Sequence, residues 1–391
     1  MAKKTVIILA LLITLLLSPA SLCASSISGS ISGSDSAQNI IQESGLDDIE
    51  PYYNSEISQY LNNDSFMDAL MSYLKGEDIS ELSFGEILKE LAIAAFHDNI
   101  GSVALIVAFI IFLSLINMLT SSVGSTQSNQ AAFYAVFLML LIILVTFVYQ
   151  IVNSVNVTVS SMSEFMNVLM VPLLSLMAMS GAVSTAAILS PMLLFYIDFI
   201  ASIIKTVIVP LFMLSFAVGI INQAALELKL KSFEKLIKQA AYFIMGLVML
   251  SFGAMSAIKG IAFSSLDGVM GKSVKYAVSN LIPVVGRFLS DSADTVASVS
   301  LIIKNGAGFI AYIILLFIVL VPIIKTGVII LLLKASAAIT EPISDERCTA
   351  LIETAANAMM NILSCMVLCA VMFFIFIAIV CTMSNYAAML R

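Results

Sequence analysis

Charge is scarce in this sequence. Only 11% of its 391 residues are Asp, Glu, Lys or Arg, whereas 60% are hydrophobic. Soluble domains carry roughly 25% charged residues. This composition excludes a water-soluble globular protein and indicates an integral membrane protein.

Basic residues are scarcer than acidic ones. The chain has 18 Lys and Arg against 25 Asp and Glu, which gives a formal net charge of −7. It has no Arg-rich run and no basic patch with interleaved aromatic residues. Proteins that bind nucleic acids need such patches to neutralise phosphates. We therefore expect no nucleic-acid partner.

Residues that commonly carry catalysis are also missing. Histidine occurs once, as His97, and the five cysteines form no C-x-x-C pair. The H-E-x-x-H and G-x-S-x-G motifs are absent, although metallo- and serine hydrolases depend on them. The segment "DGVMGKS", Asp267 to Ser273, follows Leu266 where a phosphate-binding loop requires glycine. We expect no catalytic residues, metal or cofactor, and we predict that the cysteines are small core residues.

The N-terminal residues follow the order of a secretory signal peptide. Lys3 and Lys4 precede a short apolar run, after which Ala20 and Ala24 offer cleavage sites. We predict a signal peptide over residues 1–24. The mature N-terminus would then lie outside the cytoplasm.

Acidic residues are concentrated ahead of the membrane spans. Between Ser25 and Asp98 the sequence has 14 Asp and Glu but only two Lys. The first part is rich in Ser and Gly, and from Ile40 onward apolar residues recur at helical intervals. We predict that residues 25–98 form a linker and a small acidic helical region outside the cytoplasm. Because this region is small for an independent core, it should pack on a partner or on the membrane domain.

Long apolar runs fill the rest of the chain. A helix needs about 20 apolar residues to cross a bilayer; six runs approach that length and three are shorter or interrupted. The six runs are 101–119, 131–152, 182–204, 240–263, 306–324 and 358–383, and the three doubtful ones are 165–180, 207–221 and 326–338. The sequence thus predicts an all-α polytopic domain over residues 99–391, with about six to nine transmembrane or re-entrant helices.

A lysine-rich segment indicates the orientation. Four lysines lie between Leu226 and Gln239, and basic loops stay in the cytoplasm under the positive-inside rule. Five crossings upstream of this segment would return the N-terminal region to the outside. One crossing downstream would place residues 264–305 outside as well. The side of the C-terminus depends on whether 326–338 crosses.

Two charged residues lie in or beside an apolar run. Asp198 and Lys205 are seven residues apart, which places them within about 20° of each other around a helix. Charges inside a membrane usually face a cavity or a partner, so this pair is a candidate functional site. The structural alternative is that Lys205 extends to a lipid headgroup and Asp198 caps a neighbouring helix.

Glycine recurs every seven residues at Gly246, Gly253 and Gly260. Small residues on one helix face let a second helix approach closely in a bilayer. We therefore expect this stripe to serve helix packing.

Two similar fragments suggest an internal repeat. "AAILSP" and "AAITEP" each end about 20 residues after the proline of a Val-Pro dipeptide, and transporters often contain repeats with Pro-interrupted segments. The fragments are short, so the repeat is a hypothesis for the structure to test.

Residues 283–303 have the pattern of an amphipathic helix. On a helical wheel, Arg287, Asp291, Asp294 and Ser298 lie within a stripe about 60° wide, and apolar residues occupy the other side. Such a helix either lies on the membrane surface or lines a vestibule or subunit interface on the outer side. Neither role requires catalysis.

The same segment resembles a known family. The stretch "YAVSNLIPVVGRFLSDSADTVASVSLIIKNGAG" is similar to the stage III sporulation protein AE family of spore-forming Firmicutes, and the loop "EPISDE" further along the chain fits the same family. The residues that carry the resemblance are Pro283, Gly286, Ser290, Asp291, Ala293, Asp294 and Thr295.

The resemblance implies a polytopic protein of the mother-cell membrane that faces the forespore during endospore formation. It further implies a subunit of a channel or secretion-like complex, together with a separate ATPase, ring-forming subunits and a forespore membrane protein. It transfers no catalytic residues. We expect the core polytopic subunit of that complex, with homo-oligomer formation as a further expectation. The alternative is a permease-like solute transporter that acts alone or with a separate ATPase.

Overall fold

The computed structural model describes residues 40–41, 43–56, 65–74, 84–123, 126–224, 230–262, 285–342 and 345–389. The predicted signal peptide, the start of the predicted linker and residues 264–284 of the predicted outer segment 264–305 lie outside these residues. All regular elements of the described ranges are helical, and six candidate spans are long and apolar enough to cross a membrane. The prediction of an all-α polytopic protein is therefore confirmed.

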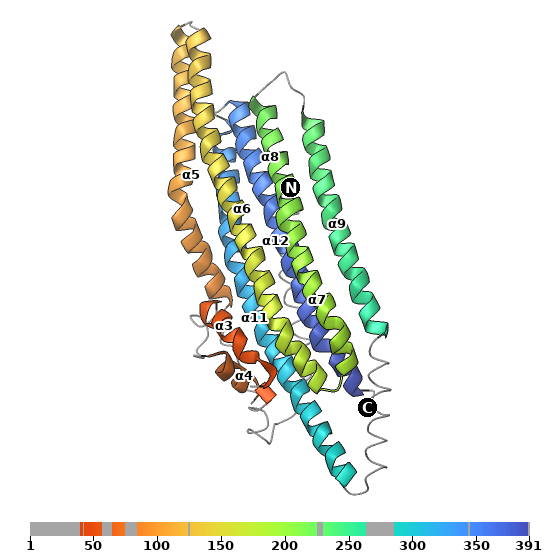
Figure 1. Ribbon diagram of the computed structural model, residues 1–391. Coiled ribbons are helices and arrows are strands. Elements are labelled where there is room, and N and C mark those ends of the chain that lie inside the picture. The colour runs from red at the N-terminus through yellow and green to blue at the C-terminus, as the bar shows by residue number, and fades with distance from the viewer. Residues whose placement is uncertain are drawn as a thin grey trace.

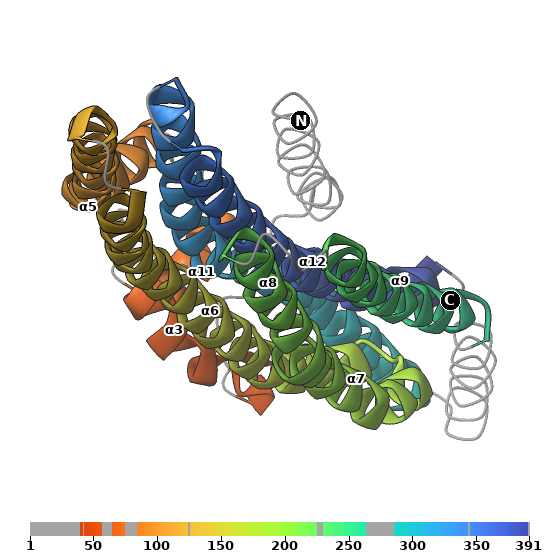
Figure 2. The ribbon, with the colours of Figure 1, turned by 90° about the horizontal axis from the view of Figure 1, so that it is seen from above.

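Long helices that alternate in direction form the bundle (Figure 1). Their bounds are α5 Phe84–Val123, α6 Thr126–Met179, α7 Val183–Ile203, η2 Ile204–Ile208, α8 Val209–Ala224, α9 Lys231–Ala262, α11 Val285–Thr340 and α12 Glu346–Met389. Seen along the bundle, α5 and α9 lie at opposite edges (Figure 2). Most of the buried hydrophobic residues belong to the helices α6, α11 and α12 that lie between them.

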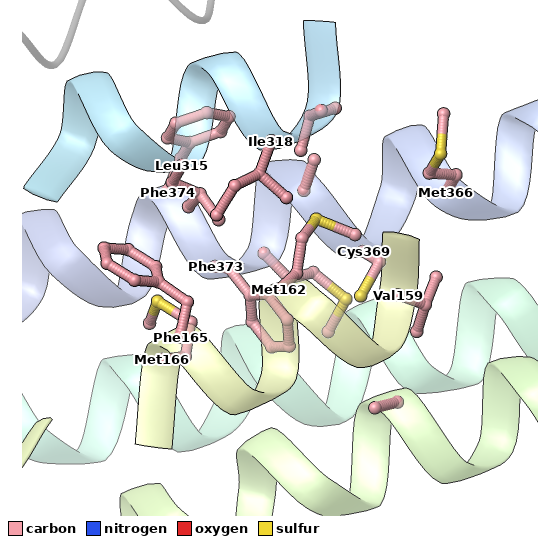
Figure 3. Close-up of a cluster of buried hydrophobic side chains, with 14 of the residues drawn as sticks. Val159, Met162, Phe165, Met166, Leu315, Ile318, Met366, Cys369, Phe373 and Phe374 are labelled. Atoms are coloured by element: carbon pink, nitrogen blue, oxygen red, sulfur yellow. The ribbon is translucent and has the colours of Figure 1, made fainter. Parts of the chain in front are cut away.

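Apolar side chains from three helices fill the centre of the bundle (Figure 3). Phe165 of α6, Leu315 of α11 and Phe373 of α12 are fully buried in one cluster. Methionines join this cluster, since their flexible side chains fill irregular gaps. As predicted, the cysteines of the described ranges are buried core residues: Cys348, Cys365, Cys369 and Cys381.

The three doubtful apolar runs are parts of longer helices. The run 165–180 lies almost wholly in α6, 207–221 lies in the continuous α7–η2–α8 helix, and 326–338 lies in α11. The polar residues between positions 153 and 164 interrupt the hydropathy of α6 but not its helix. Three candidate spans therefore precede α9 in place of the five expected. Both numbers are odd, so the inferred side of the N-terminal region is unchanged.

Gly181 makes the sharp turn from α6 to α7. Its φ of 95° lies in the left-handed region, which glycine adopts without steric cost. The Ala182 N–H donates to the Met177 carbonyl at 3.2 Å, and the Gly181 N–H donates to the Ala178 carbonyl at 2.9 Å. These bonds satisfy carbonyls at the end of α6 in the manner of a Schellman turn. The chain therefore reverses within a few residues.

The central helices are much longer than a bilayer is thick. α6 has 54 residues and α11 has 56, so each is about 80 Å long at 1.5 Å per residue, against a hydrocarbon core of about 30 Å. The α7–η2–α8 helix has 42 residues and α12 has 44. α6 forms a hairpin with α7–η2–α8, and α11 forms one with α12. In both hairpins the first helix is longer than the second by the same number of residues. α6 and α11 extend beyond their partners at opposite ends of the bundle.

The suggested internal repeat does not correspond to a repeat in the fold. Pro172 lies close to the end of α6, whereas Pro322 lies well inside α11, and both helices continue through the proline. "AAILSP" belongs to the first turns of α7, but "AAITEP" ends α11 and begins the following turn. The fragments occupy positions that are not equivalent.

The acidic N-terminal region packs on one end of the bundle (Figure 1). Its elements are η1 Leu46–Ile49, α3 Glu50–Glu56 and α4 Phe66–Leu74. Leu46 and Ile49 are fully buried, and the ring of Tyr52 lies edge-on at 5.4 Å from the ring of Phe165 in α6. The region shares the core of the membrane domain, which is one of the two arrangements expected from its small size.

The amphipathic segment is the N-terminal part of α11. This helix begins at Val285 and continues without a break into the membrane span. Arg287, Asp291 and Asp294 lie in its first three turns, and their side chains are outside what the structure describes; Ser298 is exposed. The segment is thus the projecting end of a long helix and not a separate surface helix.

Two glycines mark close approaches to α12. A Cβ atom on Gly308 of α11 would overlap Cys381 Sγ, and one on Gly219 of α8 would lie 2.7 Å from Thr354 Cγ2. Packed cores do not accept extra methyl groups without strain. Glycine therefore permits the contacts of α11 and α8 with α12.

We predict that Gly308→Ala destabilises the folded protein by about 1–3 kcal/mol, the usual cost of overpacking. Thermal unfolding of the full chain in detergent measures the loss. Gly327→Ala, also in α11, is the matched control, because a Cβ there meets nothing within 4 Å. Adding Cys381→Ala removes the overlapping thiol and should restore most of the stability. A Gly308→Ala protein as stable as the parent would contradict this packing.

Candidate functional site between α6 and α7

Polar side chains of α6 and α7 meet near the middle of the α7–η2–α8 helix. Asp198 Oδ1 accepts hydrogen bonds from Asn167 Nδ2 at 2.9 Å and from Ser163 Oγ at 3.3 Å. Lys205 Nζ donates to Ser160 Oγ at 2.9 Å. We name these five residues the α6–α7 polar seam.

Helical spacing creates the α6 side of the seam. Ser160, Ser163 and Asn167 are three and four residues apart, so they lie on one face of the helix. Asp198 and Lys205, which the sequence places on a shared face, both contact this face of α6. Sequence reasoning missed the α6 partners because they belong to the polar interruption of an apolar run. Their spacing by three and four is the signal that could have found them.

The two charges of the seam bond to neutral partners and not to each other. Asp198 bonds to a hydroxyl and an amide, and Lys205 bonds to a hydroxyl. Seven residues separate them, or about 10 Å along a helix. Neither charge neutralises the other directly. The simple alternative for Lys205, extension to a headgroup, does not describe its contact with Ser160.

Around Asp198 the seam is exposed on the lateral surface of the bundle. This residue is exposed, and the rings of Phe195 and Phe199 stack beside it at 5.9 Å with exposed fractions of 66% and 36%. A charged side chain that faces the centre of a bilayer costs at least about 2.5 kcal/mol. Contact with water or protein is therefore more favourable than contact with lipid at the surface around Asp198.

The helix is irregular where Lys205 lies. η2 is a π-helix, in which the Val209 N–H bonds to the Ile204 carbonyl five residues earlier. Pro210 accounts for the irregularity, because proline has no N–H for the Thr206 carbonyl and its ring would clash with that carbonyl in a regular helix. π-turns often occur at functional sites. Here the widened turn carries the amine of the seam.

The acidic region adjoins the seam through α6. Glu164 is exposed and follows Ser163, which contacts Asp198. The next residue, Phe165, packs against the Tyr52 ring. Burial raises the pKa of the Tyr52 phenol, and the Glu164 carboxylate raises it further. Glu164 therefore lies between the acidic region and the seam.

A second buried polar group lies between α11 and α12. Lys304 is fully buried, and its Nζ donates to the Cys381 carbonyl at 2.8 Å and to the Val380 carbonyl at 3.3 Å. Ser300 and Asn305 are buried near it in sequence. Lysine is rarely fully buried unless it has polar partners. Sequence reasoning missed Lys304, although a lysine directly after "SLII" was a visible signal.

The glycine stripe of α9 faces away from the other described helices. Gly246 and Gly253 are exposed, and a Cβ atom on either would meet nothing within 4 Å. The opposite face of α9 packs inward through Val248 and Phe252, which are nearly buried. The surroundings of Gly260 lie outside the described side chains. For this stripe, close packing of a second helix stays a prediction.

The seam offers one carboxylate, one amine, two hydroxyls and one amide. In the ranges that the structure describes, no three His, Cys, Asp or Glu side chains are grouped to hold a metal ion. The groups of the seam can bind polar solutes or water by hydrogen bonds and charge. The arrangement therefore suits binding of polar groups or water.

Comparison with known proteins gives one family. The family described as stage III sporulation protein AE matches residues 65–384. Stage III sporulation protein AE of Bacillus subtilis (strain 168) is 27% identical over 228 residues, which are 58% of this chain and 57% of the relative. The chain thus matches little more than half of that relative's length. No solved structure matches the fold.

We predict a coupling free energy of about 0.6–1.7 kcal/mol between Asn167 and Asp198, the range for hydrogen bonds between membrane helices. A double-mutant cycle with Asn167→Ala and Asp198→Ala, measured by reversible unfolding in lipid bicelles, gives this quantity. Asn167 and Lys205, which share no hydrogen bond, form the control pair and should couple weakly. Equal coupling in the two cycles would contradict the contact.

Proposed function

The chain belongs to the stage III sporulation protein AE family, and we propose that it is the core polytopic subunit of a sporulation channel or secretion-like complex. Family membership implies a role in sporulation, and the apolar helices make it a multi-pass membrane protein. We propose further that it lies in the mother-cell membrane and faces the forespore.

One observation carries this proposal. α6 and α11 are each about 80 Å long, and they extend beyond their hairpin partners at opposite ends of the bundle. A subunit that joins an ATPase on one side of a membrane to ring-forming proteins on the other needs ordered surfaces on both sides. Helices that exceed the bilayer in both directions supply such surfaces.

We assign the lysine-rich end of the bundle to the cytoplasm. Lys231, Lys235 and Lys238 lie in the first turns of α9, where basic residues favour the cytoplasmic side. Three spans precede α9, so the acidic region is on the outer side. Three spans from α9 onward bring the end of α12 to the outer side as well.

The outer end carries the surfaces suited to ring-forming subunits and to the forespore membrane protein. Asp47, Asp48 and Asp68 of the acidic region are exposed there, and the projecting end of α11 lies at the same end of the bundle (Figure 1). The ATPase would meet the other end, where the α5–α6 hairpin extends. The membrane would therefore lie between the two kinds of partner.

Asp291→Lys and Asp294→Lys should each impair assembly of the complex while membrane insertion and chain level stay normal. Both positions lie on the predicted polar face of the projecting end of α11. A partner surface complementary to aspartate would meet a like charge in the lysine variants, and like-charge contacts at an interface cost several kcal/mol. A loss of about 1.4 kcal/mol weakens partner binding tenfold, and we expect heat-resistant spore counts to fall with assembly of the complex.

Asp291→Glu keeps the charge and is the matched control. Spore counts and co-purification of partner subunits are measured on the same cultures. Normal spore yield in both lysine variants would refute a partner surface at this end of α11.

A further inference from the structure

We propose that the exposed lateral face of the α6–α7 polar seam is in contact with water and forms one wall of a path for small hydrophilic solutes. The inference rests on the proposed function, because it names the surface of the conduit subunit that solutes touch. It places the path on the flank of the bundle and not along its axis.

The centre of the bundle has no room for such a path among α6, α11 and α12. Met162 and Phe165 of α6, Leu315 of α11, and Cys369 and Phe373 of α12 are all fully buried. Figure 3 shows these side chains filling the space between the three helices. A hydrated path therefore has to run over an outer face.

Two carboxylates lie at one level on the outer faces of α6 and α7. α6 ends at Met179 and α7 begins at Val183. The number of residues from Glu164 to Met179 equals the number from Val183 to Asp198. Both are therefore about 22 Å from the turn that joins the helices. Both are also exposed. Each charge would cost about 2.5–3.5 kcal/mol or more in hydrocarbon. This surface is therefore unsuited to contact with lipid.

The acidic region indicates that water reaches this level. Tyr52 packs on Phe165, so α3 lies beside α6 at the height of the seam. Asp47 and Asp48, in the 3-10 turn just before α3, are exposed, and exposed carboxylates need an aqueous surrounding. Water on this flank of α6 therefore lies at about the level of Asp198.

The groups of the seam keep hydrogen-bonding capacity for a solute. Both bonds to Asp198 are made at Oδ1. Lys205 donates one bond, to Ser160, and an ammonium group has three N–H donors. Ser202, one turn beyond Asp198, adds an exposed hydroxyl. With Glu164 and Asp198 at one level, the wall should concentrate cations there.

Thiol reactivity in the full chain tests this inference. Ser202→Cys places a reporter on the seam face, and Leu250→Cys places one on α9, where Leu250 is 71% exposed on an apolar surface. The four described native cysteines are buried, so the parent chain gives the background. Thiols react as thiolates, which form in water and not in lipid. In membranes of sporulating cells, a cationic methanethiosulfonate should modify Ser202→Cys at least about tenfold faster than Leu250→Cys.

The charge of the reagent gives a second readout. The cationic reagent should modify Ser202→Cys several-fold faster than an anionic reagent of similar size, because the carboxylates concentrate cations. Glu164→Gln combined with Asp198→Asn should remove that preference without closing the site to either reagent. Persistence of the preference in the double variant would show that the carboxylates do not face the path.

Two results would overturn the inference. Reaction at Ser202→Cys as slow as at Leu250→Cys would show a lipid-facing surface. Protection of Ser202→Cys in the assembled complex, with reaction only in the isolated chain, would show a subunit contact. Neither result would refute the proposed function, which the spore counts of the Asp291 and Asp294 variants test separately.

Discussion

The length of the central helices is the constraint on which the rest of the structure depends. α6 and α11 are each about 80 Å long, whereas the bilayer interior spans about 30 Å. The parts that leave the membrane must still bury their apolar faces. The core between α6, α11 and α12 satisfies this requirement, and the acidic region covers part of α6 and α11 at one end. The projecting ends are the surfaces where we propose that other proteins bind.

The number of helices could be predicted only to a range, for a physical reason. Hydropathy reports side chains, whereas a helix is held by its own backbone hydrogen bonds. Between positions 153 and 164 of α6, polar side chains end an apolar run, but each backbone group still finds its partner one turn away. The same reasoning applies at Pro322, where one missing N–H does not stop a helix that neighbouring helices support. Long helices therefore resemble several short spans in the sequence.

The candidate site could be found in part from the sequence. Asp198 and Lys205 stand out because charges are rare in apolar runs. The spacing of Ser160 and Asn167 places them on one face of α6, but only the packing of α7 on α6 shows that Lys205 and Asp198 are their partners. Lys304 is visible in the sequence as a lysine next to an apolar run, but its partners are backbone carbonyls of α12, which no sequence pattern identifies. The seam and the buried lysine thus depend on tertiary contacts.

The central claim is that six long helices each cross the membrane once, so the two ends of the bundle lie on opposite sides. Single cysteines at Val183, in the first turn of α7, and at Glu341, just after α11, test it directly because both positions are exposed. With an impermeant thiol reagent, Val183→Cys should react only from the outer side and Glu341→Cys only from the cytoplasm. Reaction of both from the same side would mean that at least one of the runs 165–180, 207–221 and 326–338 is a separate crossing, and would contradict single crossings.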